Sequence, residues 1–123
     1  MDIEEITADL AARGIRSPAS ATLAKYGWSL REWYQMLKRQ SFKCPICDQT
    51  PLTGQFVTDH EHTLRWARMP AARRKLYVRG LLCWFDNRHI VVRGASPQKL
   101  RNAARYLARY ERRSRTGVRR RPK

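Results

Sequence analysis

Three cysteines constrain the fold of this chain more than any other feature of its sequence. Cys44 and Cys47 form a Cys-x-x-Cys pair, which is half of a typical structural zinc site, and Cys83 supplies a third sulfur at the spacing of a zinc ribbon. An odd cysteine count disfavours a disulfide scaffold. A chain of 123 residues, 29% of them charged, builds only a small core, so a metal that joins two segments would stabilise it substantially.

The fourth zinc ligand is an open question in this pattern. In the usual spacing it would be a cysteine three residues after Cys83, and Asp86 holds that position. A carboxylate oxygen binds zinc, so Asp86 is one candidate, and His89, one helical turn from Asp86, is the other. A further alternative is that no zinc binds and the cysteines pack as small apolar side chains. We favour a structural Zn²⁺ site, with Asp86 slightly ahead of His89.

Local sequence signals predict a mostly helical α+β fold. Apolar spacing, capping patterns and Ser-Pro start signals predict helices over residues 2–13, 18–26, from 30 onward, 87–92 and from 97 onward. Turn signals and β-branched content predict strands that end at Asp59 and at Cys83. Residues 63–75 are rich in arginine and without clear periodicity, so we expect a surface loop. The aromatic stripe in the third helix is expected to pack in the core.

The chain is expected to form one domain over residues 1–111, with a helical N-terminal extension over residues 1–28. Residues 112–123 are dominated by Arg, Ser, Thr, Gly, Pro and Lys, a composition that buries too little apolar surface to order itself. This segment is therefore predicted to be a basic, disordered tail.

A formal net charge of +16 indicates a polyanionic partner, and nucleic acid is the commonest one. An anionic membrane surface is the competing partner. No apolar run approaches the ~20 residues that a membrane-spanning helix needs, and the acidic N-terminus is unlike a signal peptide. We therefore expect a cytoplasmic protein that is not inserted in a membrane and whose cysteines are reduced.

Asp59, His60 and Asn87 are the candidate catalytic residues. The Asp59 carboxylate and the Asn87 amide supply the oxygen ligands that a hard cation such as Mg²⁺ or Mn²⁺ prefers. The His60 imidazole can take a proton from water near neutral pH. His62 falls on the same strand face if the extended geometry continues, as a further ligand, a phosphate contact or an ordinary surface histidine. Taken alone, these residues also fit a polar turn and a helix cap.

Basic residues around these positions predict a DNA-binding surface that recognises backbone and shape, because no segment resembles a base-reading module. The predicted contacts are Arg65, Arg68, Arg73, Arg74, Lys75, Arg79, Arg88, Arg105, Arg109 and Arg112.

Several motifs together resemble the recombination endonuclease VII family of phage nucleases, within the HNH or ββα-metal (His-Me finger) group. The resemblance spans roughly residues 24–110 and includes the motifs at residues 25–27, 44–47, 59–62, 79–83, 87 and 100–107. It implies a ββα-metal core flanked by helices, with His60 as general base and Asp59 and Asn87 around a catalytic metal. It also implies DNA as the substrate, with a preference for branched DNA such as four-way junctions. Asp86 departs from the family pattern, which has a cysteine there.

Three alternatives remain open. The first is an HNH nuclease that nicks or cuts double-stranded DNA without a branch preference. The others are a non-catalytic, zinc-stabilised DNA-binding protein and a basic RNA-binding protein. The junction-resolving alternative needs two cuts, which favours a homodimer, although no dimer surface stands out.

Overall fold

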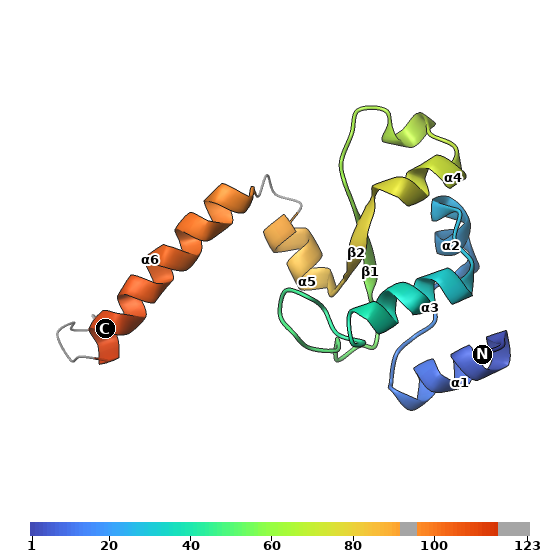
Figure 1. Cartoon of the computed structure of the whole chain (residues 1–123), viewed down its shortest axis with the longest axis horizontal. Coiled ribbons are helices and arrows are strands. Elements are labelled where there is room, and N and C mark those ends of the chain that lie inside the picture. The colour runs from blue at the N-terminus through green and yellow to red at the C-terminus, as the bar shows by residue number, and fades with distance from the viewer. Residues whose placement is uncertain (92–95, 116–123) are drawn as a thin grey trace. The chain divides into compact units, whose positions relative to one another are not determined.

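The computed structural model describes residues 1–91 and 96–115, which fall into two compact units, Met1–His89 and Ile90–Lys123 (Figure 1). The predicted mostly helical α+β fold is confirmed, because the described residues form helices before and after a single sheet of two strands. The predicted domain over residues 1–111 stays a prediction.

Capping side chains define the first and third helices. Helix α1 (Ile3–Ala12) begins at Asp2 and helix α3 (Leu30–Arg39) begins at Ser29, and both starts form a complete capping box with the glutamate three residues on. Helix α2 (Ser20–Tyr26) begins later than predicted, because Ala19 occupies its N-cap and no side chain caps it. The start predicted from Ser17-Pro18 was therefore wrong, because the helix begins at Ser20 and not at Pro18. The predicted end before Gly27 is confirmed.

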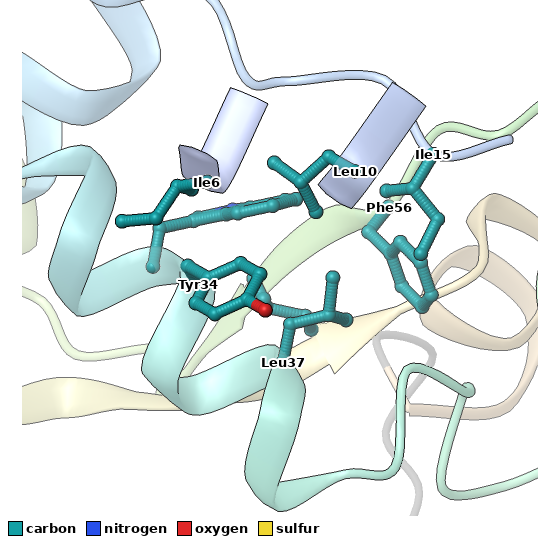
Figure 2. Packing of buried hydrophobic residues seen from close by; sticks show 8 residues of the cluster. Ile6, Leu10, Ile15, Tyr34, Leu37 and Phe56 are labelled. Carbon is teal, nitrogen blue, oxygen red and sulfur yellow. The ribbon is translucent and has the colours of Figure 1, made fainter. Parts of the chain in front are cut away.

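The core forms between α1, α3 and the sheet (Figure 2). Figure 2 shows Ile6 and Leu10 of α1 facing Tyr34 and Leu37 of α3. Trp33, Ile15, Phe56 and Leu81 complete this buried cluster. The aromatic stripe of α3 is thus core, as predicted, and the N-terminal segment is part of the core because α1 contributes two fully buried side chains.

The sheet pairs β1 (Val57–His60) with β2 (Val78–Leu82) in antiparallel fashion. β1 runs one residue beyond its predicted end at Asp59, and β2 ends one residue before its predicted end at Cys83. The register changes between Asp59, which pairs with Gly80, and His60, which pairs with Val78. Arg79 therefore lies between two paired positions, as the extra residue of a β-bulge does.

The Gln40 side chain hydrogen-bonds β2 as a neighbouring strand would. Its amide nitrogen donates to the Leu81 carbonyl at 2.8 Å, and its oxygen accepts from the Leu81 N–H at 2.9 Å. Because Leu81 is fully buried, water cannot replace these bonds.

Gln40→Ala is therefore expected to reduce the free energy of unfolding by about 2 kcal/mol, because it leaves two buried backbone groups without partners. Urea unfolding of the metal-loaded protein measures this loss. Gln35→Ala, at an exposed position of α3, is the control and should change the free energy of unfolding by less than ~0.5 kcal/mol. Equal stability of both variants would contradict the proposed role of Gln40.

The arginine-rich segment predicted as a loop contains three short helices, so that prediction was wrong. They are η1 (Trp66–Arg68), α4 (Ala71–Arg74) and η2 (Lys75–Tyr77). The segment folds through one internal anchor, since the Arg74 guanidinium donates to the carbonyls of Trp66 and Ala67 at 3.2 and 3.0 Å, respectively. A third bond, 3.4 Å to the Lys25 carbonyl, ties the segment to α2, which packs against α4 (Figure 1).

The helix predicted to open at Asn87 begins earlier. Helix α5 (Trp84–Asp86) has Cys83 at its N-cap, and the Cys83 sulfur accepts from the Asp86 N–H at 3.4 Å. A π-helical turn, η3 (Asn87–Val91), follows directly. The predicted start was wrong because the capping group is a cysteine sulfur, whereas sequence reasoning favours a polar oxygen at this position. Such π-turns often mark functional positions.

The second unit contains helix α6 (Pro97–Arg115), which starts at the predicted Ser96-Pro97 signal. The Ser96 hydroxyl accepts from the Lys99 N–H at 3.1 Å. Residues 112–115, predicted to belong to a disordered tail, are helical here, and residues 116–123 lie outside the described part of the chain. Within the described residues, no helix combines the length and the apolar character needed to cross a bilayer.

Candidate functional site

A cluster of three cysteines and one aspartate joins the loop after α3 to the start of α5. One ligating atom from each of Cys44, Cys47, Cys83 and Asp86 lies within 4.8 Å of the others. Four such donors around one point match the number and type of ligands that structural zinc prefers. The predicted set with Asp86 is therefore brought together by the fold, and it can hold a metal such as zinc.

Within this cluster, the Asp86 carboxylate accepts hydrogen bonds from the cysteine thiols. The thiols of Cys44 and Cys83 donate to the same Asp86 oxygen at 3.2 and 3.1 Å. Burial acts to raise the pKa of Asp86, but the bonds from the Cys83, Cys44 and Cys47 thiols outweigh it and lower that pKa. Burial, with the neighbouring Asp86 carboxylate, raises the pKa of Cys83 to about 12. A cation at this point would replace the thiol protons and satisfy the same oxygen.

The alternative zinc ligand, His89, lies elsewhere. Its ring packs against the exposed rings of Trp84 and Phe85, at centroid distances of 5.5 and 4.6 Å. Within the described residues it does not belong to the ligand cluster, which favours Asp86 as the fourth donor.

His60, at the end of β1, is held by aromatic rings from two other segments. The Trp66 indole stacks on its imidazole with centroids 3.7 Å apart and planes 12° from parallel. On another side, the Tyr26 hydroxyl lies 3.5 Å from His60 Nδ1. The His62 ring lies 4.7 Å from that of His60, so the two histidines are close although the strand ends at His60.

This environment keeps the His60 imidazole neutral at neutral pH. Burial lowers the pKa of His60, and the charges of His62, Lys25 and Arg79 lower it further, against the opposing effect of Asp59. A neutral ring with a depressed pKa is available to accept a proton. Burial also raises the pKa of Tyr26, so its hydroxyl stays protonated and can share a hydrogen bond with the ring.

Sequence reasoning missed Trp66 and Tyr26 as parts of this site. Trp66 lies in the segment predicted as a loop, and no pattern places its ring on His60. Tyr26 is brought there by the close approach of α2 to α4. Gly27, which ends α2 with φ +64°, allows that approach, because a Cβ at this position would lie 3.0 Å from the Ala71 backbone.

Asp59 is buried beside β2, and Arg79 binds it with two hydrogen bonds. Arg79 Nε donates to Asp59 Oδ2 at 2.8 Å and its terminal nitrogen donates to Oδ1 at 3.0 Å. The Asp59 side chain is 6% exposed, whereas that of Arg79 is 46% exposed. Both carboxylate oxygens are therefore engaged by a guanidinium that is itself half in solvent.

Asn87 has a buried amide oxygen, Oδ1, that lacks a hydrogen-bond donor. The residue lines a hollow together with Tyr26 of α2 and Val57 and Thr58 of β1. A buried oxygen without a donor is costly unless a ligand satisfies it, and a divalent cation is such a ligand. The Asn87 oxygen thus fits a hard cation as a ligand, but neither Asp59 nor His60 lines the same hollow. Direct convergence of Asn87 and Asp59 on one ion stays a prediction.

The predicted DNA-contacting residues divide into two groups. Three of them are engaged within the protein: Arg74 with backbone carbonyls, Lys75 in an ion pair with Glu32, and Arg79 with Asp59. The remaining ones are exposed, although one of them, Arg105, also donates to Asn102 within α6. They are Arg65, Arg68, Arg73, Arg88, Arg105, Arg109 and Arg112. Within α6, the last three line one hollow and so present a continuous basic face.

Comparison with known proteins identifies the family of the chain. The family described as recombination endonuclease VII matches residues 19–109, a range that includes the Cys44, Cys47, Cys83 and Asp86 cluster as well as Asp59, His60 and Asn87. No curated protein and no solved structure matched the chain. Because the match covers well over half of its 123 residues, the chain belongs to the recombination endonuclease VII family.

Proposed function

We propose that the protein is a metal-dependent DNA endonuclease that hydrolyses phosphodiester bonds. The observation that carries this proposal is the stacking of Trp66 on the His60 imidazole, which follows the buried Asp59 at the end of β1. Hydrolysis of a phosphodiester needs a base for the attacking water and stabilisation of the charge that develops on phosphate oxygens. Membership of the family supports DNA as the substrate.

His60 serves as the general base. When Nδ1 carries the ring proton and shares it with the Tyr26 oxygen, Nε2 keeps its lone pair and takes the proton from water. Trp66 holds the ring plane, so the base is oriented before substrate binds. His62, next to it, is placed to contact a phosphate oxygen or to act as a further ligand.

Asp59 and Asn87 are the proposed ligands of Mg²⁺ or Mn²⁺. When bound, this ion would stabilise negative charge on the scissile phosphate and on the leaving oxygen. The two side chains contribute complementary donors, a carboxylate that offsets the charge of the ion and a neutral amide whose oxygen is free to bind. The separate ligand set at Cys44, Cys47, Cys83 and Asp86 would hold a structural Zn²⁺, and that ion would anchor α5, and thereby Asn87, to the loop after α3.

Branched DNA such as four-way junctions is the proposed substrate class, supported by the family alone. Cleavage of supercoiled, linear, single-stranded and four-way-junction DNA in Mg²⁺ tests it, with an EDTA lane as the control. Faster cutting of the junction supports junction resolution, and equal cutting of all duplexes supports a general HNH nuclease. Binding without cleavage of any DNA in Mg²⁺ or Mn²⁺ would support the alternative of a DNA-binding protein. Sedimentation of the junction complex tests the homodimer that two cuts favour.

Trp66→Ala is expected to lower the cleavage rate by about 10- to 100-fold at saturating DNA, because His60 loses the ring that orients it. Trp66→Phe retains an aromatic face and should keep most of the activity. Single-turnover kinetics measures both variants, and circular dichroism checks that they fold. Equal rates for Trp66→Ala and the wild type would remove Trp66 from the site.

Double replacement of Arg105 and Arg109 by glutamine is expected to weaken DNA binding. If each side chain neutralises one phosphate, the slope of log affinity against log salt becomes less steep by about 2. Fluorescence anisotropy at salt concentrations from about 50 to about 300 mM measures the slope. Arg13→Gln, at a position already paired with Asp9, is the control and should leave the slope unchanged. An unchanged slope in the double variant would place DNA on another surface.

A further inference from the structure

The bidentate contact between Arg79 and Asp59 bears on how the proposed catalytic metal would bind. Arg79 occupies the irregular position in β2, between the residues that pair with Asp59 and His60. A bulge of this kind re-aims the side chain of its extra residue. Here the guanidinium reaches across the strand pair and takes both oxygens of the carboxylate.

The two partners differ in their freedom to move. Asp59 is in a paired strand and its side chain is 6% exposed, so its carboxylate is fixed in place. The Arg79 side chain is 46% exposed, so its guanidinium can rotate into solvent without opening the core. A buried carboxylate needs a positive partner, because an unpaired buried charge is strongly unfavourable. One such partner can therefore be exchanged for another while Asp59 stays where it is.

We propose that Arg79 is a displaceable counter-ion that competes with the divalent cation for Asp59. In the metal-free protein, the guanidinium neutralises the buried carboxylate through two hydrogen bonds. A divalent ion binds to Asp59 only when it displaces that guanidinium. Arg79 therefore weakens metal binding and raises the metal concentration at which the site becomes occupied. This inference rests on the proposed function in one respect, the assignment of Asp59 as a metal ligand.

Mn²⁺ binding to the zinc-saturated, DNA-free protein tests this competition without any reference to activity. Electron paramagnetic resonance measures free Mn²⁺ for the wild type, Arg79→Gln and Arg79→Lys. Arg79→Gln, which removes the positive charge and the paired N–H donors of the guanidinium, is expected to bind Mn²⁺ about 10-fold more tightly, equivalent to about 1.4 kcal/mol. Arg79→Lys keeps the charge but cannot hold both oxygens in one plane, so about threefold tighter binding is expected. Arg73→Gln, an exposed arginine on α4, is the matched control and should stay within about twofold.

A second measurement observes the exchange directly. The Arg79 Nε–H is bonded to Asp59 Oδ2, so its ¹⁵N resonance should move and its hydrogen exchange should accelerate as Mg²⁺ is added. Asp59→Asn should abolish this response to Mg²⁺, because the variant loses the carboxylate for which the two cations compete.

The outcomes separate this inference from the proposed function. Unchanged or weaker Mn²⁺ binding in Arg79→Gln overturns the competition, even when the wild type cleaves DNA. Tighter binding in Arg79→Gln supports it, even when no DNA is cleaved by any variant. Should Arg79→Gln fail to fold, as judged by circular dichroism, Arg79→Lys decides in the same way, and Mn²⁺ affinity equal to that of the wild type overturns the proposal.

Discussion

Replacing His60 with alanine is expected to reduce the rate of DNA cleavage by about 10²- to 10⁴-fold, the range associated with loss of a general base. The physical reason is that the remaining ionisable groups near the site are poorly suited to accept the proton. Asp59 is held by Arg79, and Tyr26 has a raised pKa and stays protonated. Affinity for DNA should change by less than about threefold, because the imidazole is neutral and contributes no charge to phosphate binding.

Single-turnover cleavage of supercoiled and cruciform DNA in Mg²⁺ measures this effect, with anisotropy in EDTA for binding. His89→Ala is the matched control, since it removes a histidine that packs on Trp84 and Phe85 and should retain the wild-type rate. Cleavage by His60→Ala at close to the wild-type rate would assign the base to another residue. His62→Ala then becomes the next variant to measure, given its ring contact with His60.

Asp86→Ala is expected to lose the bound zinc and a large part of the stability of the protein. The variant removes one of the four ligands, and in the metal-free protein it also removes the acceptor of the Cys44 and Cys83 thiols. A loss of about 3 kcal/mol would lower the melting temperature by roughly 10–20 °C in a domain of this size. Cleavage should fall in parallel, because Asp86 is the last residue of α5 and directly precedes Asn87, the first residue of the π-turn.

Asp86→Cys is the informative companion, because it restores a four-cysteine set in the same geometry and should keep one zinc per chain. His89→Ala should also keep its zinc, since that ring lies outside the ligand cluster. Mass-spectrometric metal analysis of the purified proteins, together with thermal melts, measures all three variants. One equivalent of zinc in Asp86→Ala would exclude Asp86 as a ligand, and zinc in none of the proteins, wild type included, would support the alternative in which the cysteines only pack.

Local signals predicted the parts of the fold that depend on neighbouring residues. Asp2 and Ser29 cap the helices that follow them because each side chain bonds to a backbone group three residues away. The buried stripe of α3 follows from helical periodicity alone. The same reasoning failed at α2, which no side chain caps, and at α5, which is capped by the sulfur of Cys83.

The segment over residues 63–75 shows the limit of such reasoning more clearly. Its short helices are stabilised by Arg74, whose three acceptors are carbonyls on this segment and on α2. An arginine that anchors backbone is indistinguishable in sequence from an arginine that contacts phosphate. Its assignment as a DNA contact depended on composition, whereas its actual partners depend on packing between α2 and α4.

The sequence by itself determined the chemical groups at each site and the family to which the chain belongs, because ligand types, spacing and capping are properties of nearby residues. Only the tertiary structure decided which groups meet. It brought Asp86 rather than His89 to the cysteines, stacked Trp66 on His60, and set Arg79 against both oxygens of Asp59. The physical reason is that Cys44 and Asp86 lie 42 positions apart in the chain and Asp59 and Arg79 lie 20 apart, next to a strand irregularity. The stacking of Trp66 on His60 depends on how the segment after β1 folds. No local pattern encodes the direction in which such side chains point.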